Sequence, residues 1–275
     1  MSIFKDNLLA GKTAFLTGGG SGINLAIAER YAEHGARVAL VGRSLERTEG
    51  AAAAIKARGG TALGLSADVR DYAALEAAIK ATTEAYGAID LVVCGAAGNF
   101  PAQATGMSAN AFKSVIDIDL LGTFNTCRAA FEHLRKPGAS ILMISAIQAL
   151  QPMSFQAHVC AAKAGVDMLM KSLALEWGEH GIRLNSIAPG PVAGTEGLRR
   201  MGPAADSEAL RGSLPLKRYA EKDEIADLAL FLATEAARNI TGAVIPSDGG
   251  NSVLGAGRMI ETAVKAAMGS KSLSS

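Results

Sequence analysis

The chain of 275 residues is poor in the side chains that build disulfide frameworks and metal sites. It has three cysteines, at positions 94, 127 and 160, which are odd in number, widely separated and set among apolar neighbours. This pattern argues against a disulfide framework, and no metal-ligand spacing links the three residues, so no metal is expected. Buried free thiols in a reducing compartment fit the pattern best.

Charge is also scarce, and neither sign dominates. Lys and Arg number 27 against 26 Asp and Glu, for a net charge of +1, and no basic run or arm is present. A nucleic acid is therefore not an expected partner.

Membrane and export signals are missing as well. No apolar run is long enough to span a bilayer, the opening MSIFKDNLLAGK lacks the apolar core of a secretory signal, and the closing SLSS is not a peroxisomal address. We expect a soluble cytoplasmic protein that has no membrane partner.

Apolar residues are plentiful, at 49% of the chain, and they follow a regular alternation. Short β-branched runs such as TAFLTGG and RVALVGR precede longer alanine-rich stretches of helical period. We therefore expect an α/β fold, a Rossmann-like doubly wound parallel sheet of about seven strands with helices on both faces. No linker or repeat divides the pattern, which predicts a single domain over 1–275. Gly, Pro and charge interrupt it at 194–214, where we expect a mobile lid over the site.

A glycine-rich loop joins the first strand to the first helix. The stretch TGGGSGIN at 17–24 is typical of loops whose backbone N–H groups approach a pyrophosphate at a helix N-terminus, although an ordinary tight turn is an alternative. The last glycine of the usual pattern is replaced by Asn24, whose side chain is expected to weaken cofactor binding. The residues expected to bind the cofactor here are Gly18, Gly20, Ser21, Gly22 and Ile23.

The end of the second strand selects between the two nicotinamide dinucleotides. An acidic side chain there favours a free ribose 2′-hydroxyl, and a cation favours a 2′-phosphate. This chain has Gly42, Arg43 and Ser44, with no carboxylate, which predicts NADPH, unless Arg43 is an ordinary solvated arginine. Asp68, after the third strand, is expected beside the adenine.

Two charged residues lie on helices among apolar neighbours. Asp119 is in line with Phe112 and Thr123 at helical spacing, so its side chain should point inward, either for function or as a structural carboxylate. Asp117 is spaced instead for a surface ion pair. Lys163 adjoins the apolar stripe of the helix within 154–177 and needs a partner, unless it reaches the surface.

These features occur in a familiar order. The glycine loop, SADV at 66–69, GAAG at 95–98, Lys163 and RLNSIAPGP at 183–191 together resemble the short-chain dehydrogenase/reductase family over nearly the whole chain. That family usually has a tyrosine acid four residues before the lysine and a serine thirteen residues before the tyrosine. Here these positions hold Val159 and Ala146, so the usual proton donor is absent.

Further segments narrow the resemblance: AAGNF at 96–100, DIDLLGTFN at 117–125, His158 and PGPVAGTEGLRR at 189–200. Together they look like one branch of the family, the peroxisomal type of 2,4-dienoyl-CoA reductases. That branch also lacks the tyrosine, and its acidic site residue falls on Asp119. The mitochondrial type has its tyrosine where this chain has Gln148.

The resemblance implies NADPH-dependent reduction of 2,4-dienoyl-CoA thioesters by a homotetramer. Asp119 and Lys163 are the implied catalytic residues, with Asp119 holding a water that protonates carbon and Lys163 also holding the nicotinamide ribose. His158 and Ser145 are open as contributors. The implied nicotinamide contacts are Pro189, Gly190, Val192 and Thr195, and the implied acyl-CoA contacts are Arg70, Phe100, Ser108, Asn110 and Arg200.

Two other functions fit the same residues. One is an NADP(H)-dependent short-chain reductase that acts on another carbonyl or enoyl substrate. The other is an NADP(H)-binding protein without catalysis, in which the missing tyrosine and serine mark lost activity; a retained Asp119 and Lys163 argue against it.

Overall fold

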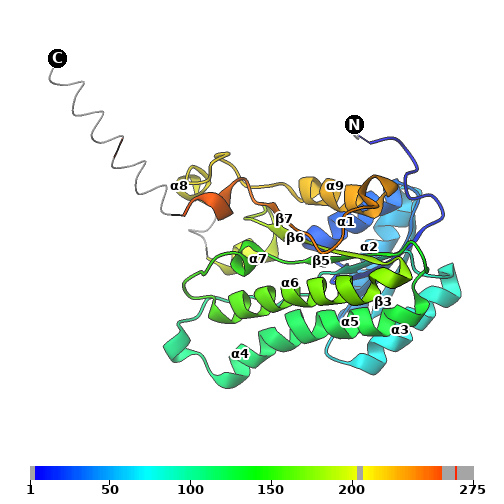
Figure 1. Cartoon of the computed structure of the whole chain (residues 1–275), viewed down its shortest axis with the longest axis horizontal. Helices are drawn as coiled ribbons and strands as arrows, with labels where there is room; N and C mark the ends of the chain where they lie inside the picture. The colour runs from blue at the N-terminus through cyan, green and yellow to red at the C-terminus, as the bar shows by residue number, and fades with distance from the viewer. Residues whose placement is uncertain (1–3, 203–206, 256–263, 265–275) are drawn as a thin grey trace, which may run out of the picture.

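A parallel sheet of seven strands in the order β3-β2-β1-β4-β5-β6-β7 forms the centre of the computed structural model, which describes residues 4–202, 207–255 and 264 (Figure 1). The expected fold class is therefore confirmed. The strands are β1 Thr13–Thr17, β2 Arg37–Gly42, β3 Thr61–Ser66, β4 Leu91–Cys94, β5 Ser140–Ile144, β6 Arg183–Pro189 and β7 Val244–Ser247.

Helices cover both faces of this sheet. One layer contains α1, α2 and α9, and the other contains α3, α5 and α6 (Figure 1). Two short helices, α7 and α8, lie in the segment expected to form a lid, of which residues 203–206 are outside the described part of the chain. The helices are α1 Gly22–Glu33, α2 Leu45–Ala57, α3 Tyr72–Tyr86, α4 Ala109–Val115, α5 Gly122–Ala130, α6 Ala157–Trp177, α7 Glu196–Arg200, α8 Glu208–Arg211 and α9 Lys222–Ala233.

The strands are buried on both faces because successive side chains of a strand point to opposite sides of the sheet. In β1, Ala14 and Leu16 join the core under α1 and α9, whereas Phe15 joins the core under α3, α5 and α6. A continuous apolar run is what a central parallel strand needs. The expected buried thiols are found at Cys94 and Cys127, but Cys160 is only half-buried.

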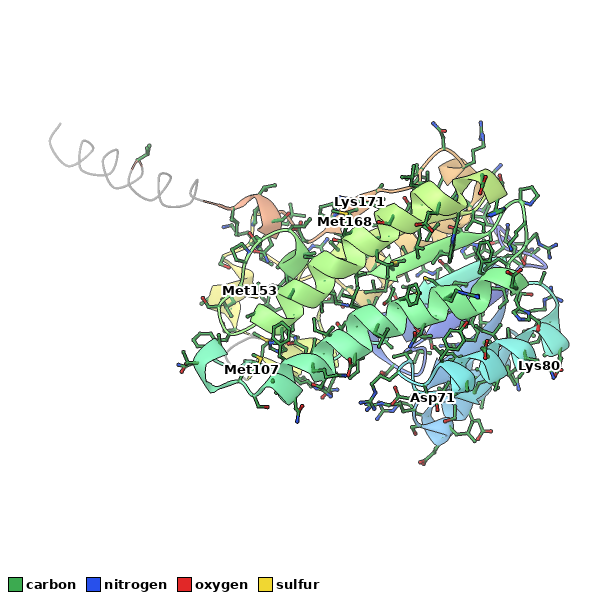
Figure 2. The ribbon with its side chains drawn as sticks, turned by 60° about the horizontal axis from the view of Figure 1, so that its bottom comes forward. Asp71, Lys80, Met107, Met153, Met168 and Lys171 are labelled. Atoms are coloured by element: carbon green, nitrogen blue, oxygen red, sulfur yellow. The ribbon has the colours of Figure 1, made fainter. Side chains whose placement is uncertain are left out.

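The helix expected from Asn110 onward contains a wide turn. Between α4 and α5, residues Ile116–Leu121 form a π-helical segment, η2. Phe112, expected on the inward face, is therefore 38% exposed, while Asp119 and Thr123 are buried as expected. Because η2 packs on α6, this segment brings Asp119 to the helix that carries Lys163. Figure 2 shows the two long helices side by side, with Met107 before α4 and Met153 before α6 at the same end of the layer.

Asn24 fits into the glycine loop because its neighbour just after β4, Gly95, has no side chain. Its Nδ2 donates to the Gly95 carbonyl at 2.7 Å, with a longer contact of 3.5 Å to the Gly18 carbonyl. A Cβ at Gly95 would lie 2.0 Å from Asn24 Oδ1. The side chain that replaces the usual glycine therefore connects the loop to β4, and weaker cofactor binding stays a prediction.

This contact predicts a compensating pair of substitutions. Gly95→Ala should destabilise the protein by about 1–3 kcal/mol, because the added methyl group overlaps the Asn24 amide. Adding Asn24→Gly should recover part of the loss. Thermal unfolding measures both, with Gly106→Ala as the control, since a Cβ there meets nothing within 4 Å. A double variant no more stable than Gly95→Ala would contradict this packing.

Candidate active site

A cleft of about 910 Å³ opens at the carboxyl ends of the strands. Its lining includes residues that end or follow β1, β2, β4, β5 and β6, so it spans the point between β1 and β4 where the strand order reverses. Ligands of doubly wound sheets bind at this switch point. The volume lies in the range of small-molecule and cofactor sites.

Every residue expected to bind a dinucleotide except Lys163 lines this cleft, in the part that we call the cofactor half; Asn99, Gln148, Gln156 and Arg200 line the other part, the substrate half. Gly18 and Gly22 have φ values of +67° and +62°, which glycine adopts without strain. Ser21 is the N-cap of α1 and its side chain makes no cap hydrogen bond, so the first turn keeps donors for an anion. The expected residues that line the cleft are Gly18, Gly20, Ser21, Gly22, Ile23, Arg43, Ser44, Asp68, Pro189, Gly190, Val192 and Thr195.

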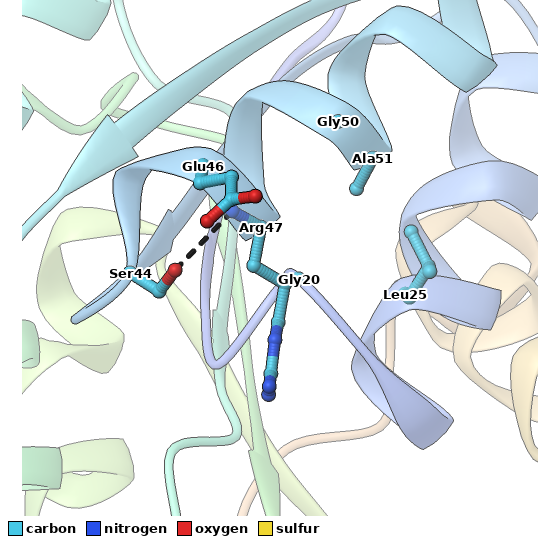
Figure 3. A pocket seen from close by; sticks show the side chains of 7 residues that line it. All are labelled: Gly20, Leu25, Ser44, Glu46, Arg47, Gly50 and Ala51. Atoms are coloured by element: carbon cyan, nitrogen blue, oxygen red, sulfur yellow. Dashed lines mark hydrogen bonds between the residues drawn. The ribbon is translucent and has the colours of Figure 1, made fainter.

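A second arginine, Arg47, lines the part of the cleft where Arg43 and Ser44 are expected to hold the cofactor ribose, and it was not expected from the sequence. A side pocket of about 430 Å³ adjoins the cleft and shares Gly20, Ser44 and Arg47 with it (Figure 3). Ser44 caps α2 by accepting the Arg47 backbone N–H at 3.3 Å, and the Arg47 side chain extends past Gly20. Neither Arg43 nor Arg47 has an ion-pair partner within 4 Å in the part of the chain that the structure describes. The place of Arg47 in the chain could have indicated this role, because the first turn of the helix after β2 faces the glycine loop.

Arg70, expected at the substrate, lies outside the residues that line the cleft. Its guanidinium forms two hydrogen bonds with the Asp68 carboxylate, at 3.0 and 2.6 Å. The hydrogen bond from Arg70 is the main reason that the pKa of Asp68 is lowered. Asp68 is therefore held as a carboxylate at the edge of the cofactor half, and a contact of Arg70 with substrate stays a prediction.

A buried ion pair lies at the border between the two halves of the cleft. Lys163 Nζ is 3.1 Å from Asp119 Oδ2, and it donates to the Ile144 carbonyl at 2.9 Å. Asp119 Oδ1 accepts the Gly98 backbone N–H at 2.6 Å. The two residues are 1% and 6% exposed, while Ile118 and Ile144 beside them line the cleft. The structure thus brings together the two residues expected to be catalytic.

The pair keeps hydrogen-bonding capacity for ligands. An ammonium has three donors; Lys163 uses one for the Ile144 carbonyl, and its 3.1 Å contact with Asp119 Oδ2 is an ion pair without a well-aligned hydrogen bond, so a donor is left for a cofactor hydroxyl. Asp119 Oδ2 has no well-aligned hydrogen bond within the described residues and retains lone pairs for a water. Val159, where the family has its tyrosine, packs with Val115 and Ala162 and supplies no acid.

His158 and Phe100 lie near this pair, behind the residues that line the cleft. Their rings stack with centroids 4.3 Å apart and planes at 34°. His158 is fully buried, and burial lowers its pKa against the opposing effect of the Asp119 charge, which favours a neutral imidazole. Phe100 does not line the cleft directly, so its contact with substrate stays a prediction.

The other expected substrate residues are divided between the cleft and the surface. Arg200 lines the cleft and donates to the Asn99 carbonyl at 3.3 Å. Ser108 is the N-cap of α4, where its hydroxyl accepts the Ala111 N–H at 3.1 Å, and Asn110 is exposed in the first turn. Neither lies among the residues that line the cleft.

A second buried carboxylate, Asp167, lies one helical turn beyond Lys163. Burial raises its pKa, and the nearby hydroxyls of Ser145 and Ser186 and the charge of Lys163 partly offset this rise. Those hydroxyls are close enough to stabilise the charged form, although none of the oxygens forms a well-aligned hydrogen bond. Of this group, Ser145 lines the cleft.

The doubly wound sheet, the glycine loop at its switch point and the buried lysine beside the far half of the cleft define an oxidoreductase that uses a nicotinamide dinucleotide. Comparison with known proteins identifies the family. A family model described as enoyl-(acyl carrier protein) reductase matches residues 18–252, and the chain belongs to the short-chain dehydrogenase/reductase family.

Individual relatives agree with this assignment. The chain is 45% identical over 252 residues to the peroxisomal 2,4-dienoyl-CoA reductase of Rattus norvegicus, covering 90% of this chain and 86% of the relative. It is 43% identical over 251 residues to that of Saccharomyces cerevisiae, with the same coverage. A short-chain dehydrogenase structure from Burkholderia cenocepacia in complex with NADP superimposes with a TM-score of 0.82 at 30% identity, covering 88% of this chain and 98% of that one.

The resemblance inferred from the sequence is thereby confirmed. Because these relatives are named as peroxisomal, the cytoplasmic expectation stays unconfirmed. Within the described residues, no helix combines the length and the apolar composition needed to cross a membrane.

Proposed function

We propose that the protein reduces 2,4-dienoyl-CoA thioesters with NADPH. The observation that carries this proposal is the buried Asp119–Lys163 pair beside a cleft whose usual tyrosine position is Val159. A carbonyl reductase needs an acid at the reacting oxygen, whereas a conjugated thioester can be protonated at carbon by a bound water. The names of the relatives support the same substrate class.

Close packing determines the shape of the glycine loop, and this shape supports a cofactor site. A Cβ at Gly18 would lie about 3 Å from Asn24 and Gly95, so packing requires glycine there and holds the loop close to β4, while the first-turn N–H groups of α1 are left for a pyrophosphate. Arg43, Ser44 and Arg47 gather at the ribose end without a carboxylate in the turn after β2. Two guanidinium groups there suit a 2′-phosphate, which supports NADPH over NADH.

Arg47 offers a test of this cofactor assignment. Arg47→Ala should raise the KM for NADPH by about 10-fold or more and leave the KM for NADH nearly unchanged, since a charge-assisted hydrogen bond contributes about 1.5–3 kcal/mol. Steady-state kinetics with both cofactors measures the ratio. Arg58→Ala, at the other end of α2, is the control. Equal losses with the two cofactors would place Arg47 away from the phosphate.

The chemistry follows from where charge develops. Held by the glycine loop, Arg43 and Lys163, NADPH would supply a hydride to the δ carbon of the dienoyl thioester, whose electrons would move toward the thioester oxygen as a dienolate. Lys163 would supply positive field near that oxygen and hold the ribose. Asp119, fixed by the Gly98 N–H and Lys163, would orient a water that gives a proton to carbon and takes one back from solvent. The apolar neighbours Val115 and Val159 strengthen the field because they lower the local dielectric.

The two members of the pair should be separable by kinetics. Asp119→Asn should lower kcat by about 100-fold or more, the scale of a lost proton-transfer group, and leave the Kd for NADPH within about twofold. Lys163→Met should damage both quantities, because Lys163 also meets the ribose. Asp117→Asn is the matched control, since its carboxylate pairs at the surface with Lys113. Full activity in Asp119→Asn would remove Asp119 from the mechanism.

The substrate class itself is tested with the unaltered protein. NADPH oxidation should be fast with 2,4-hexadienoyl-CoA or 2,4-decadienoyl-CoA and slow with simple ketones. Activity on ketones alone would favour a different short-chain reductase. NADPH binding without turnover of any of these substrates would favour a non-catalytic binding protein.

A homotetramer is part of the proposal. Four large apolar side chains remain exposed on the outer layer, Leu121 in η2, Phe124 on α5, and Met168 and Leu175 on α6, with exposures from 42% to 86%. Figure 2 shows Met168 on α6, beside the α4–α5 helix. Exposed apolar residues on adjacent helices are typical of a surface that another protein copy covers.

A further inference from the structure

One buried side chain, Gln156, joins the loop after β4 to its own loop between β5 and α6 at the carboxyl edge of the sheet. Its Nε2 donates to Asn99 Oδ1 at 3.1 Å, and its Oε1 accepts from Gln148 Nε2 at 2.6 Å. Asn99 follows β4, Gln148 follows β5, and Gln156 begins α6. Gln156 is fully buried, and all three residues line the cleft.

The same glutamine reaches the segment that carries α7. Gln156 Nε2 lies 2.9 Å from the sulfur of Met201, and Arg200 donates to the Asn99 backbone carbonyl at 3.3 Å. The end of α7 is therefore attached at one point to the loop after β4 and at another to Gln156, just before α6. A change at Gln156 should reach the expected lid as well as the two amide side chains.

Gln156 makes these bonds instead of capping its own helix. It occupies the N-cap of α6, where Ser, Thr, Asp and Asn are preferred because their short side chains bond the first-turn N–H groups. No side-chain cap hydrogen bond is present there. One end of the Gln156 amide is directed at the loop after β4 and the other at Gln148 in its own loop, which indicates a role outside helix capping.

The amide chain has a direction. Each amide has one acceptor end and one donor end, and the bonds run from Gln148 to Gln156 to Asn99. Gln156 thus occupies the acceptor end of Asn99 and the donor end of Gln148. The ends that remain are the NH₂ of Asn99 and the carbonyl of Gln148, so one residue determines which polar group each of the other two presents to the cleft.

The amide network is connected to the buried ion pair through two consecutive residues of the loop after β4. Asp119 holds the Gly98 N–H, and Gln156 holds the side chain of the next residue, Asn99. The loop after β4 is therefore fixed at two consecutive residues, one bound to the carboxylate and the other to the amide chain. Such two-point attachment restricts the loop to one arrangement at the substrate half of the cleft.

We propose that Gln156 is a positioning residue for the substrate half of the cleft, where it sets the orientation of the Asn99 and Gln148 amides and holds the end of α7 against them. This inference rests on the proposed acyl-CoA function for its kinetic consequence. The structural consequence, a fixed arrangement of the loop after β4 and of α7, is independent of the substrate.

Gln156→Glu is the sharpest kinetic test because it preserves shape and keeps an acceptor for Gln148. It replaces the donor to Asn99 with an oxygen, so Asn99 must turn its NH₂ inward and present its carbonyl to the cleft. We expect kcat/KM for the dienoyl-CoA to fall about 10-fold or more, as for the loss of one or two hydrogen bonds, while the KM for NADPH stays within about twofold.

Gln103→Glu is the matched control, since it adds the same charge at an exposed position on the loop after β4, which also carries Asn99. Gln148→Met removes the other bond and should give a smaller loss of the same kind, which keeps the test available if Gln156→Glu does not fold. Unchanged kcat/KM in folded Gln156→Glu, or an equal loss for substrate and cofactor, would overturn the positioning role.

Hydrogen exchange supplies a readout that does not need activity. In Gln156→Leu with bound NADP⁺, amides of residues 98–106 and 196–201 should exchange faster than in the unaltered protein, while those of α9 stay unchanged. Unchanged exchange at both segments would overturn the inference. If the unaltered protein fails to reduce dienoyl-CoA, the proposed function fails, and the exchange experiment still decides whether Gln156 holds the loops.

Discussion

The buried ion pair between Asp119 and Lys163 is the constraint on which the site depends. Two charges that are 1% and 6% exposed are costly to bury, and here they pair with each other while each also has a backbone hydrogen-bond partner. The partners come from separate elements, the Gly98 N–H after β4 and the Ile144 carbonyl at the end of β5. The pair therefore fixes β4, β5, η2 and α6 relative to one another at the edge where the cleft opens. Removing one charge leaves the other buried without its partner. A replacement that preserves the shape of the side chain, such as Asp119→Asn, therefore tells more than one that also removes its volume.

The π-helical segment Ile116–Leu121 is the local feature that presents the carboxylate. A π turn inserts an extra residue into the helix, so side chains beyond it rotate relative to those before it. The hydroxyl of Thr123, near the start of α5, donates to the Asp119 carbonyl at 2.6 Å and so links the π-helical segment to the regular helix that follows. Wide turns of this kind are frequent at functional sites, and here the turn lies beside Lys163.

The fold was predictable from sequence because its signals are local and repeated. Apolar runs such as that of β1 form strands buried on both faces, and the glycine loop is recognisable from its place between a strand and a helix. The inward face of the helix from Asn110 was only partly predictable, because regular helical spacing does not anticipate a π turn, and Phe112 is exposed as a result. Arg47 and Gln156 were missed for another reason. Their roles depend on contacts with distant loops, and neither residue type marks such a contact in advance.

The valine at the usual tyrosine position connects these observations to the proposed chemistry. Val159 packs with Val115 and Ala162, so the space where related enzymes keep a hydroxyl is apolar and leaves the ion pair without a competing donor. In such surroundings a positive charge acts strongly on nearby electrons, which suits a substrate whose charge spreads over a conjugated thioester. A simple alkoxide concentrates its charge on one oxygen and needs a proton there. The same arrangement that disfavours carbonyl reduction is therefore compatible with a dienolate, provided that the neighbouring amide groups hold the thioester in one orientation.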